Sequence, residues 1–343
     1  MIYVLILAAG LWFLGREMNV PAKARWLMIG LLYVAVLGLL VLRPALAEPL
    51  GGSLGEWLLL GALVAVVLGY RRGLGGLRAR AQAREAAEAP PQTTGAFQSA
   101  ELERYARHIM LREIGGPGQK RLKQAKVLVI GAGGLGSPAC LYLAAAGVGT
   151  IGVIDDDAVE STNLQRQIAH TDARIGVPKV FSAESAMRDV NPFIEVRPYH
   201  RRLTEEIAAG LVAEYDLVLD GTDNFDTRYL ANRACLAAGV PLISGALTQW
   251  EGQISVFGGD GPCYRCVFPE APAPGLAPSC AEAGVLGPLT GVVGSMMAVE
   301  AVKLIAEAGE PLRGRMLIYD ALYGEVRVIK LSKRADCPDC GEA

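Results

Sequence analysis

The sequence predicts an α/β domain with a Rossmann-like, mostly parallel sheet that continues into an antiparallel section, preceded by about three transmembrane helices. Three observations support this prediction: uncharged runs near the N-terminus, a strand–glycine turn–helix unit in mid-chain, and closely spaced strand-like segments towards the end. Of the 343 residues, 52% are hydrophobic and 20% charged, so the chain is too apolar for an ordinary soluble domain or for disorder. The net charge of -2 argues against a nucleic-acid partner.

The N-terminal region, residues 1–72, contains three uncharged runs, at 1–14, 26–42 and 57–70. A helix that crosses about 30 Å of hydrocarbon needs about 20 apolar residues. The second run nearly reaches this length, and the third reaches 21 residues if it begins at Leu50. The first run is the weakest candidate, with a re-entrant helix or a misassigned start as alternatives. We expect about three transmembrane helices.

The charges between these runs indicate an orientation in the membrane. The first loop and the segment after Tyr70 are rich in lysine and arginine, whereas the second connection holds Arg43 against Glu48 and Glu56. The positive-inside rule places the basic segments in the cytoplasm. We therefore expect a multi-pass protein of the cell inner membrane with its C-terminal domain in the cytoplasm. Three aromatic residues at the run ends are typical of interfacial anchors: Trp26, Trp57 and Tyr70.

Residues 73–96 are predicted to form a linker, because glycines begin the stretch and a Pro-Pro pair lies near its end. The Ala/Arg/Glu-rich middle of this linker is also compatible with a helix. The remaining 97–343 are long enough for one large α/β core. This domain is expected to begin with a helix over 100–112, whose apolar residues recur at helical spacing.

The segment 126–155 has the order strand, glycine turn, helix, strand and acid. Glycines let the backbone approach a phosphate, and the N-terminus of the following helix offers free N–H groups. An acid at the end of the second strand is placed to accept hydrogen bonds from ribose hydroxyls. The segment therefore predicts a nucleotide site, with a ligand-free tight turn as the alternative. Its residues are Gly131, Gly133, Gly134, Gly136 and Asp155.

A further strand over 216–220 ends in Asp-Gly-Thr-Asp-Asn. Ligands bind at the carboxyl ends of parallel strands, so Asp223 is a candidate Mg²⁺ ligand. The alternative for Asp223 is an N-cap, because a helix is expected over 228–236.

The later segments predict the antiparallel section. A strand over 240–244 is followed by one over 253–257, and two more are expected to close the sheet, at 315–319 and 325–331. The long apolar stretch at 288–306 could be read as a fourth span. Its charges, Glu300 and Lys303, and its glycines favour a buried helix or one in a dimer interface.

Four of the seven cysteines form two C-x-x-C pairs, Cys263 with Cys266 and Cys337 with Cys340. In a reducing compartment such pairs bind tetrahedral Zn²⁺ more often than they form disulfides. The 70-residue gap between the pairs exceeds that of a compact zinc ribbon, so unrelated reduced pairs or a redox motif are alternatives. Cys280 follows a proline-rich segment in which a thiol is easier to reach, with an incidental surface cysteine as its alternative.

Taken together, these motifs resemble the ThiF/MoeB/HesA family, the bacterial relatives of ubiquitin-activating enzymes, most closely its MoeB branch of molybdopterin-synthase adenylyltransferases. The resemblance runs from about Glu101 to Cys340 and leaves 1–96 unexplained. The motifs that support it are Arg104-Tyr-Ala-Arg107, the glycine turn, Asn163-Leu-Gln-Arg166-Gln, Lys179, Asp220-Gly-Thr-Asp223-Asn224, Glu251-Gly-Gln253 and both C-x-x-C pairs.

The resemblance implies a homodimer that uses ATP and Mg²⁺ to adenylate a small β-grasp sulfur-carrier protein. The reaction joins the carrier's C-terminal glycine carboxylate, at the end of a Gly-Gly tail, to AMP and releases pyrophosphate. It would serve sulfur transfer in molybdopterin or thiamin biosynthesis. Because no rhodanese-like domain follows Cys340, we expect a separate sulfur donor, of the cysteine desulfurase or rhodanese type.

The resemblance also assigns roles to residues. Gly134 would back the phosphates and Asp155 would hold the ribose. The triphosphate would lie against Asn163, Arg166 and Lys179, with Asp223 on Mg²⁺ and Asn224 beside it. Arg107 would reach in from the partner subunit, and Cys280 matches a cysteine that some relatives bond to the carrier. The implied catalytic residues are Arg107, Arg166, Asp223 and Cys280.

Two other functions remain as alternatives. A non-catalytic membrane scaffold would keep the fold and the zinc without turnover. An NAD-dependent oxidoreductase would use the glycine turn and Asp155 alone, but the sequence contains nothing that resembles a hydride-transfer site.

Overall fold

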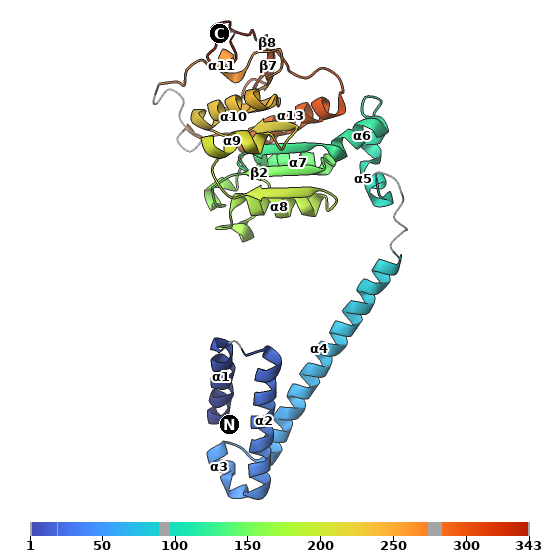
Figure 1. Cartoon of the computed structure of the whole chain (residues 1–343), viewed down its shortest axis with the longest axis vertical. Coiled ribbons are helices and arrows are strands. Elements are labelled where there is room, and N and C mark those ends of the chain that lie inside the picture. Colours follow the sequence, from blue (N-terminus) through green and yellow to red (C-terminus); the bar gives the residue numbers. More distant parts are fainter. Residues whose placement is uncertain (1, 19, 89–96, 274–282, 342–343) are drawn as a thin grey trace. The chain divides into compact units, whose positions relative to one another are not determined.

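The computed structural model describes residues 2–18, 20–88, 97–273 and 283–341. The chain divides into two compact units, Met1–Pro91 and Gln92–Ala343 (Figure 1). Cys280, one of the predicted site residues, lies outside the described residues.

The N-terminal unit is helical. Windows in its second and fourth α-helices, Lys23–Leu42 and Leu54–Arg71, are long and apolar enough to cross a membrane, whereas the apolar helix Ile6–Arg16 is shorter. The first predicted span is therefore the shortest of the three candidates in the structure as well. The elements of the unit are α1 (Ile2–Glu17), α2 (Ala22–Leu42), η1 (Pro44–Leu46), α3 (Ala47–Leu50) and α4 (Leu54–Glu88).

Helix α4 continues well beyond the third apolar run. It includes 73–88, so the first part of the predicted linker is helical, and 89–96 lie outside the described residues. The glycines in this stretch each cost about 1 kcal/mol relative to alanine, but the alanines, arginines and glutamates after them are strong helix formers. The helical alternative for the middle of the linker is the one that the structure adopts.

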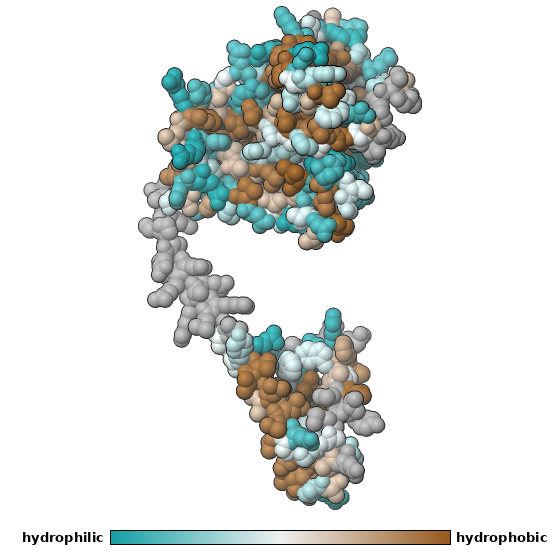
Figure 2. All heavy atoms as spheres, turned by 180° about the vertical axis from the view of Figure 1, so that it is seen from behind, coloured by the Kyte–Doolittle hydropathy of each residue, from teal (hydrophilic) through white to brown (hydrophobic). Residues whose placement is uncertain are grey.

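Most large apolar side chains of this unit face outwards, as the brown surface in Figure 2 shows. Trp57 differs, because it is 1% exposed and packs against Val36 and Leu40. The carbonyl oxygen of Trp57 accepts a hydrogen bond from the hydroxyl of Tyr33 at 2.7 Å. Trp57 thus joins α2 to α4 instead of lying at the surface like the other two predicted anchors.

The C-terminal unit contains one eight-stranded sheet in the order β3-β2-β1-β4-β5-β6-β7-β8. The first five strands in this order, from β3 through β2, β1 and β4 to β5, pair in parallel. The pairs β5 with β6, β6 with β7 and β7 with β8 are antiparallel. The predicted mixed sheet is therefore confirmed. The strands are β1 (Lys126–Ile130), β2 (Thr150–Ile154), β3 (Glu195–Tyr199), β4 (Leu217–Asp220), β5 (Leu242–Leu247), β6 (Glu251–Phe257), β7 (Arg315–Asp320) and β8 (Glu325–Lys330).

Helices cover both faces of the sheet, because successive side chains of a buried strand point to opposite sides. In β1, Val127 and Val129 pack with α7, α8 and α13, whereas Leu128 and Ile130 pack with α9 and α10. The helices are α5 (Ser99–Ile109), α6 (Gly115–Gln124), α7 (Gly136–Ala146), α8 (Lys179–Val190), α9 (Glu205–Val212), α10 (Phe225–Ala238), α11 (Tyr264–Val267) and α13 (Gly287–Ala306), with short 3₁₀ turns η2 (Ser161–Asn163) and η3 (Asp172–Arg174).

Two elements of this unit illustrate what the sequence pattern could and could not predict. Helix α13 is long and apolar enough for a membrane span, yet half of it is buried inside the unit. The buried half agrees with the prediction of a buried helix, and a dimer interface on its other side stays a prediction. Strand β3 was not predicted, because it carries charged residues and Pro198, as an edge strand can.

Candidate active site

A cavity of about 620 Å³ opens at the carboxyl ends of β1, β2 and β4. The strand order reverses between β1 and β4, and in open α/β sheets ligands bind at this switch point. The cavity brings together residues from several predicted motifs that are far apart in the sequence, including Glu251-Gly-Gln253. The predicted site residues that line it are Gly131, Gly133, Gly134, Asp155, Asn163, Arg166, Lys179, Asp223 and Asn224.

The glycine turn after β1 needs glycine for two different reasons. Gly131 has a φ of 91°, a conformation that side chains disfavour. A Cβ on Gly136 would lie 1.8 Å from the carbonyl oxygen of Gly131. Gly136 therefore supports the turn from inside helix α7 and does not line the cavity.

Asp155 is fixed against this turn by two backbone hydrogen bonds. Its Oδ2 accepts from the N–H of Ala132 and its Oδ1 from the N–H of Asp157, both at 2.8 Å. Burial raises the pKa of Asp155, while the nearby charge of Lys179 acts to lower it. Each oxygen keeps a lone pair, so the carboxylate can still accept a hydrogen bond from a ligand hydroxyl.

Two predicted cationic side chains line the cavity. The side chain of Lys179 is 6% exposed, and its Nζ lies 2.7 Å from Oδ2 of the more exposed Asp157. Arg166 donates to Oδ1 of Asn163 at 3.2 Å. A buried ammonium needs an anionic partner. Asp157 supplies this partner to Lys179 in the structure, and the two cations together suit a ligand with several negative charges, such as a triphosphate.

The loop after β4 presents Asp223 to the cavity with its carboxylate unengaged by any hydrogen bond among the described residues. The N-cap of α10 is Asn224, whose Oδ1 accepts from the N–H of Thr227 at 2.9 Å. The N-cap alternative for Asp223 is therefore wrong. Because Asn224 satisfies the helix N-terminus, Asp223 is left available for a cation.

A buried ion pair holds this loop in place, and the sequence analysis did not identify it. Asp220 is 0% exposed and accepts from both the N–H and the hydroxyl of Thr222. Arg228 lies 3.9 Å from Asp220 and donates to the carbonyl oxygens of Thr222 and Gly245. These contacts join β4, β5 and α10 around Asp223. An arginine in the first turn of a predicted helix looks like a solvated charge, so only the fold reveals its role.

His170 is a second residue that sequence reasoning missed. Its Nε2 lies 2.8 Å from the carbonyl oxygen of Ala132 in the glycine turn, and its Nδ1 lies 2.9 Å from Oγ of Ser182. Because a carbonyl can only accept, Nε2 carries the proton. Burial lowers the pKa of His170, so the ring stays neutral and pins the turn to α8.

Arg107 does not belong to the cavity of its own chain. It lies on the exposed side of α5, and it is absent from the residues that line the cavity. The structure thus leaves its role as a residue supplied to a partner subunit untested.

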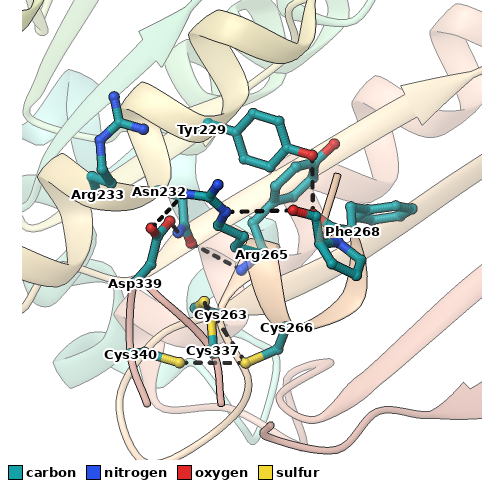
Figure 3. A network of polar contacts seen from close by, with 12 residues as sticks. Tyr229, Asn232, Arg233, Cys263, Arg265, Cys266, Phe268, Cys337, Asp339 and Cys340 are labelled. Carbon is teal, nitrogen blue, oxygen red and sulfur yellow. Dashed lines mark hydrogen bonds and ion pairs between the residues drawn. The ribbon is translucent and has the colours of Figure 1, made fainter. Parts of the chain in front are cut away.

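The two C-x-x-C pairs come together in one cluster (Figure 3), and none of its four cysteines lines the cavity. The sulfurs lie 3.6 Å apart for Cys263 with Cys337, 3.3 Å for Cys266 with Cys340 and 3.8 Å for Cys263 with Cys266. Tetrahedral Zn–S bonds of about 2.3 Å place sulfurs about 3.8 Å apart, so the cluster fits this ion.

The thiols of the cluster differ in pKa, since burial raises the pKa of Cys263 and of Cys340. Burial acts to raise the pKa of Cys337, but hydrogen bonds from the backbone of Asp339 and Cys340 and from neighbouring thiols lower it to about 7. The thiolate is the form that binds metals. The pairs are therefore not unrelated, in contrast to one of the alternatives left by the sequence.

Comparisons with known proteins agree with this geometry. Residues 105–339 match the model of the ThiF family. The chain is 49% identical over 249 residues to the SAMP-activating enzyme E1 of Haloferax volcanii, covering 73% of this chain and 92% of that protein. It is also 49% identical over 248 residues to the sulfur carrier protein adenylyltransferase of Thermus thermophilus, covering 71% and 92%.

The fold is shared with more distant structures. The crystal structure of E. coli MccB superposes with a TM-score of 0.62 at 22% identity, covering 73% of this chain and 75% of that one. The family match covers all eight strands, the residues that line the cavity and three of the four cysteines of the cluster. The chain belongs to the ThiF family.

Proposed function

We propose that this protein adenylates the C-terminal glycine carboxylate of a small β-grasp sulfur-carrier protein that ends in Gly-Gly. Pyrophosphate leaves, and the acyl-adenylate serves sulfur transfer in molybdopterin or thiamin biosynthesis. The observation that carries this proposal is the convergence of Arg166, Lys179 and Asp223 on the glycine turn in one cavity. Two relatives that are 49% identical, named as an E1 enzyme and a sulfur carrier protein adenylyltransferase, support it.

The chemistry follows from where the charges lie. ATP binds with its phosphates on the glycine turn and its ribose on Asp155. The carrier carboxylate attacks the α-phosphorus, and the bond to the β-phosphate oxygen breaks. Negative charge then grows on the phosphate oxygens, where Arg166 and Lys179 stabilise it. Asp223 would hold Mg²⁺ there, and the ion would neutralise charge on the leaving pyrophosphate.

We propose that the active enzyme is a homodimer in which Arg107 enters the partner's cavity. One side of α13 and α7 exposes apolar side chains to solvent. Tyr142 is 58% exposed and Val299 is 56% exposed. Such a contiguous apolar surface suits a second copy of the chain. Arg107 would act there as an arginine finger does in phosphoryl transfer.

The cysteine cluster would hold a structural Zn²⁺, because its four ligands leave no open position. The thiolate of Cys280 would attack the C-terminal carboxyl carbon of the carrier in the acyl-adenylate. A thioester to Cys280 would form, and AMP would leave. The sulfur donor would be a separate protein, of the cysteine desulfurase or rhodanese type.

We propose that α1, α2 and α4 anchor the enzyme in the cell inner membrane as a multi-pass protein. The outward-facing apolar side chains of α2 and α4 support this placement (Figure 2). Arginines after Tyr70 favour a cytoplasmic C-terminal unit.

ATP–pyrophosphate exchange tests the proposed function. We expect the purified protein with Mg²⁺ to exchange labelled pyrophosphate into ATP only when a carrier ending in Gly-Gly is present. A carrier without its last glycine is the matched control. Normal ATP binding without exchange across a panel of such carriers would favour the scaffold alternative. Thermal stabilisation by NAD instead of ATP would favour the oxidoreductase.

A further inference from the structure

The cysteine cluster and the nucleotide cavity share one short stretch of chain, 263–268. Cys263 and Cys266 belong to the cluster, whereas Tyr264 and Phe268 line the cavity. The rings of Tyr264 and Phe268 lie 4.8 Å apart, and Tyr264 is 3% exposed. A displacement of this stretch would therefore change both sites at once.

Asp339 ties the cluster to helix α10 (Figure 3). It lies between Cys337 and Cys340, and its side chain is 4% exposed. Its Oδ2 accepts from Nδ2 of Asn232 at 2.8 Å, and its Oδ1 accepts from the guanidinium of Arg265 at 3.0 Å. A buried carboxylate is stable here because both oxygens are paired.

Asn232 carries this link on to the cavity wall. It is 1% exposed, and its Oδ1 accepts from the backbone N–H of Tyr264 at 2.9 Å. One end of the amide thus holds the loop of Asp339, and the other end holds Tyr264. Tyr229, one turn earlier on α10, donates its hydroxyl to the carbonyl oxygen of Phe268 at 3.0 Å. Helix α10 therefore fixes both aromatic residues of the wall.

We propose, on the basis of the adenylyltransferase function proposed above, that Asn232 and Asp339 are positioning residues that couple the cysteine cluster to the cavity. The four cysteines would hold a metal, and Asp339 between Cys337 and Cys340 would then stay paired with α10. If the loop of Asp339 moves away from α10, Asn232 loses its hydrogen bond to Asp339. Tyr264 and Phe268 are then no longer held in place. Metal occupancy would thereby control ligand binding in a cavity that none of the four cysteines lines.

Two single variants break the link without changing the size of a side chain. Asp339→Asn replaces one acceptor by a donor, so one of its two contacts must be lost. Asn232→Asp places two carboxylates opposite each other but keeps the acceptor for Tyr264. The double variant restores a donor opposite an acceptor, with the direction reversed. Asp336→Asn is the matched control, because this residue lies in the same loop, is 75% exposed and pairs with Arg334.

The full-length protein is assayed for bound zinc, for hydrogen exchange of the amides in 263–268, and for the KM of ATP. We expect both single variants to keep their zinc. Hydrogen exchange of the amides in 263–268 should become faster, and the KM of ATP should rise about tenfold. In the double variant, the hydrogen-exchange rate and the KM of ATP should return to within about threefold of the unmodified protein. Asp336→Asn should change neither of them. Removal of zinc from the unmodified protein should also speed exchange in 263–268.

The proposal is overturned if the single variants keep their zinc while hydrogen exchange in 263–268 and the KM of ATP stay unchanged. It is also overturned if they lose zinc and the double variant does not restore the stretch, because the residues would then only support the metal. If either single variant does not fold, the other and the double variant decide. Zinc content and hydrogen exchange do not depend on adenylation, so absence of ATP–pyrophosphate exchange in the unmodified protein would count against the proposed function alone.

Discussion

Helices α2 and α13 have nearly the same length and are both apolar enough to cross a membrane, but they lie in different surroundings. Only 11% of the α2 window is buried inside the protein, whereas 50% of α13 is buried, where it packs against α7 and the sheet. Apolar composition therefore does not decide between a membrane span and a core helix. A complementary protein surface covers half of α13, whereas the apolar side chains of α2 have few protein neighbours among the described residues.

The same contrast separates the two units. In the C-terminal unit Val127 and Leu128 are both 0% exposed, on opposite faces of the sheet. In the described part of the N-terminal unit, the buried cluster consists of Val36, Leu40 and Trp57. The C-terminal unit thus has a core of its own that can position catalytic groups, and the N-terminal unit has a surface suited to lipid.

The sharpest test of this division is Asp223→Ala. We expect ATP–pyrophosphate exchange to fall by about 10³-fold or more, because the cation at the triphosphate loses its ligand. The exposed carboxylate makes no fold contact among the described residues, so the thermal unfolding midpoint should stay unchanged. Exchange that survives in Asp223→Ala would mean that the catalytic site lies elsewhere.

Arg107→Ala should lower exchange by about 10²- to 10³-fold, as the loss of one donor to a transition state does. Arg107 is proposed to act in the partner's cavity. In a heterodimer of an Arg107→Ala subunit and an Asp223→Ala subunit, the cavity of the first subunit therefore keeps its own Asp223 and receives Arg107 from the second, which gives one intact site. Recovery of part of the activity on mixing would be measured by the same exchange assay. No recovery, with subunit exchange shown by mass measurement, would place Arg107 in its own cavity or outside catalysis.

Removal of zinc should destabilise the C-terminal unit alone. We expect chelation, or Cys337→Ser, to lower its thermal midpoint by roughly 10 °C or more, because metal binding contributes directly to folding. Circular dichroism should show that the helices of the N-terminal unit persist. Asp336→Asn is a control, since this exposed residue lies in the loop of Cys337 but outside the cluster. An unchanged midpoint after verified metal loss would contradict a structural role.

Removal of residues 1–96 should change catalysis least. We expect the remaining domain to stay in solution without detergent and to keep its exchange rate within about threefold, because its core lies within the C-terminal unit. The full chain should sediment with membranes and need detergent for extraction. A full chain that is soluble without detergent would reverse the contrast between the units.

The smallest expected effect concerns His170. Burial lowers its pKa, so below about pH 6.5 the unfolded chain binds a proton that the folded chain does not. The free energy of unfolding should therefore be fully retained above this pH and fall as the pH drops towards the folded pKa. His170→Gln should show a weaker loss between pH 7.5 and 5.5 in thermal melts. Parallel curves for both proteins would contradict a neutral buried imidazole.

The fold could be predicted where patterns are local. Strands β1 and β2, the turn between them and Asp155 lie within one short segment, and the residue types there leave few conformations open. Strand β3 could not be found in this way, because its charged residues and Pro198 lack an apolar pattern. Its pairing with β2 supplies what its composition does not.

The sequence alone identified the chemical groups of the candidate site. Residue type and short spacing identified the glycine turn, Asp155, Asp223 and the two C-x-x-C pairs, and the resemblance to the ThiF/MoeB/HesA family added Arg166 and Lys179. Only the tertiary structure decided which groups meet. Asn232 contacts Asp339 across 107 residues, and His170 contacts Ala132 across 38. Such contacts depend on how the sheet folds the chain back on itself, and local sequence spacing carries no information about that path.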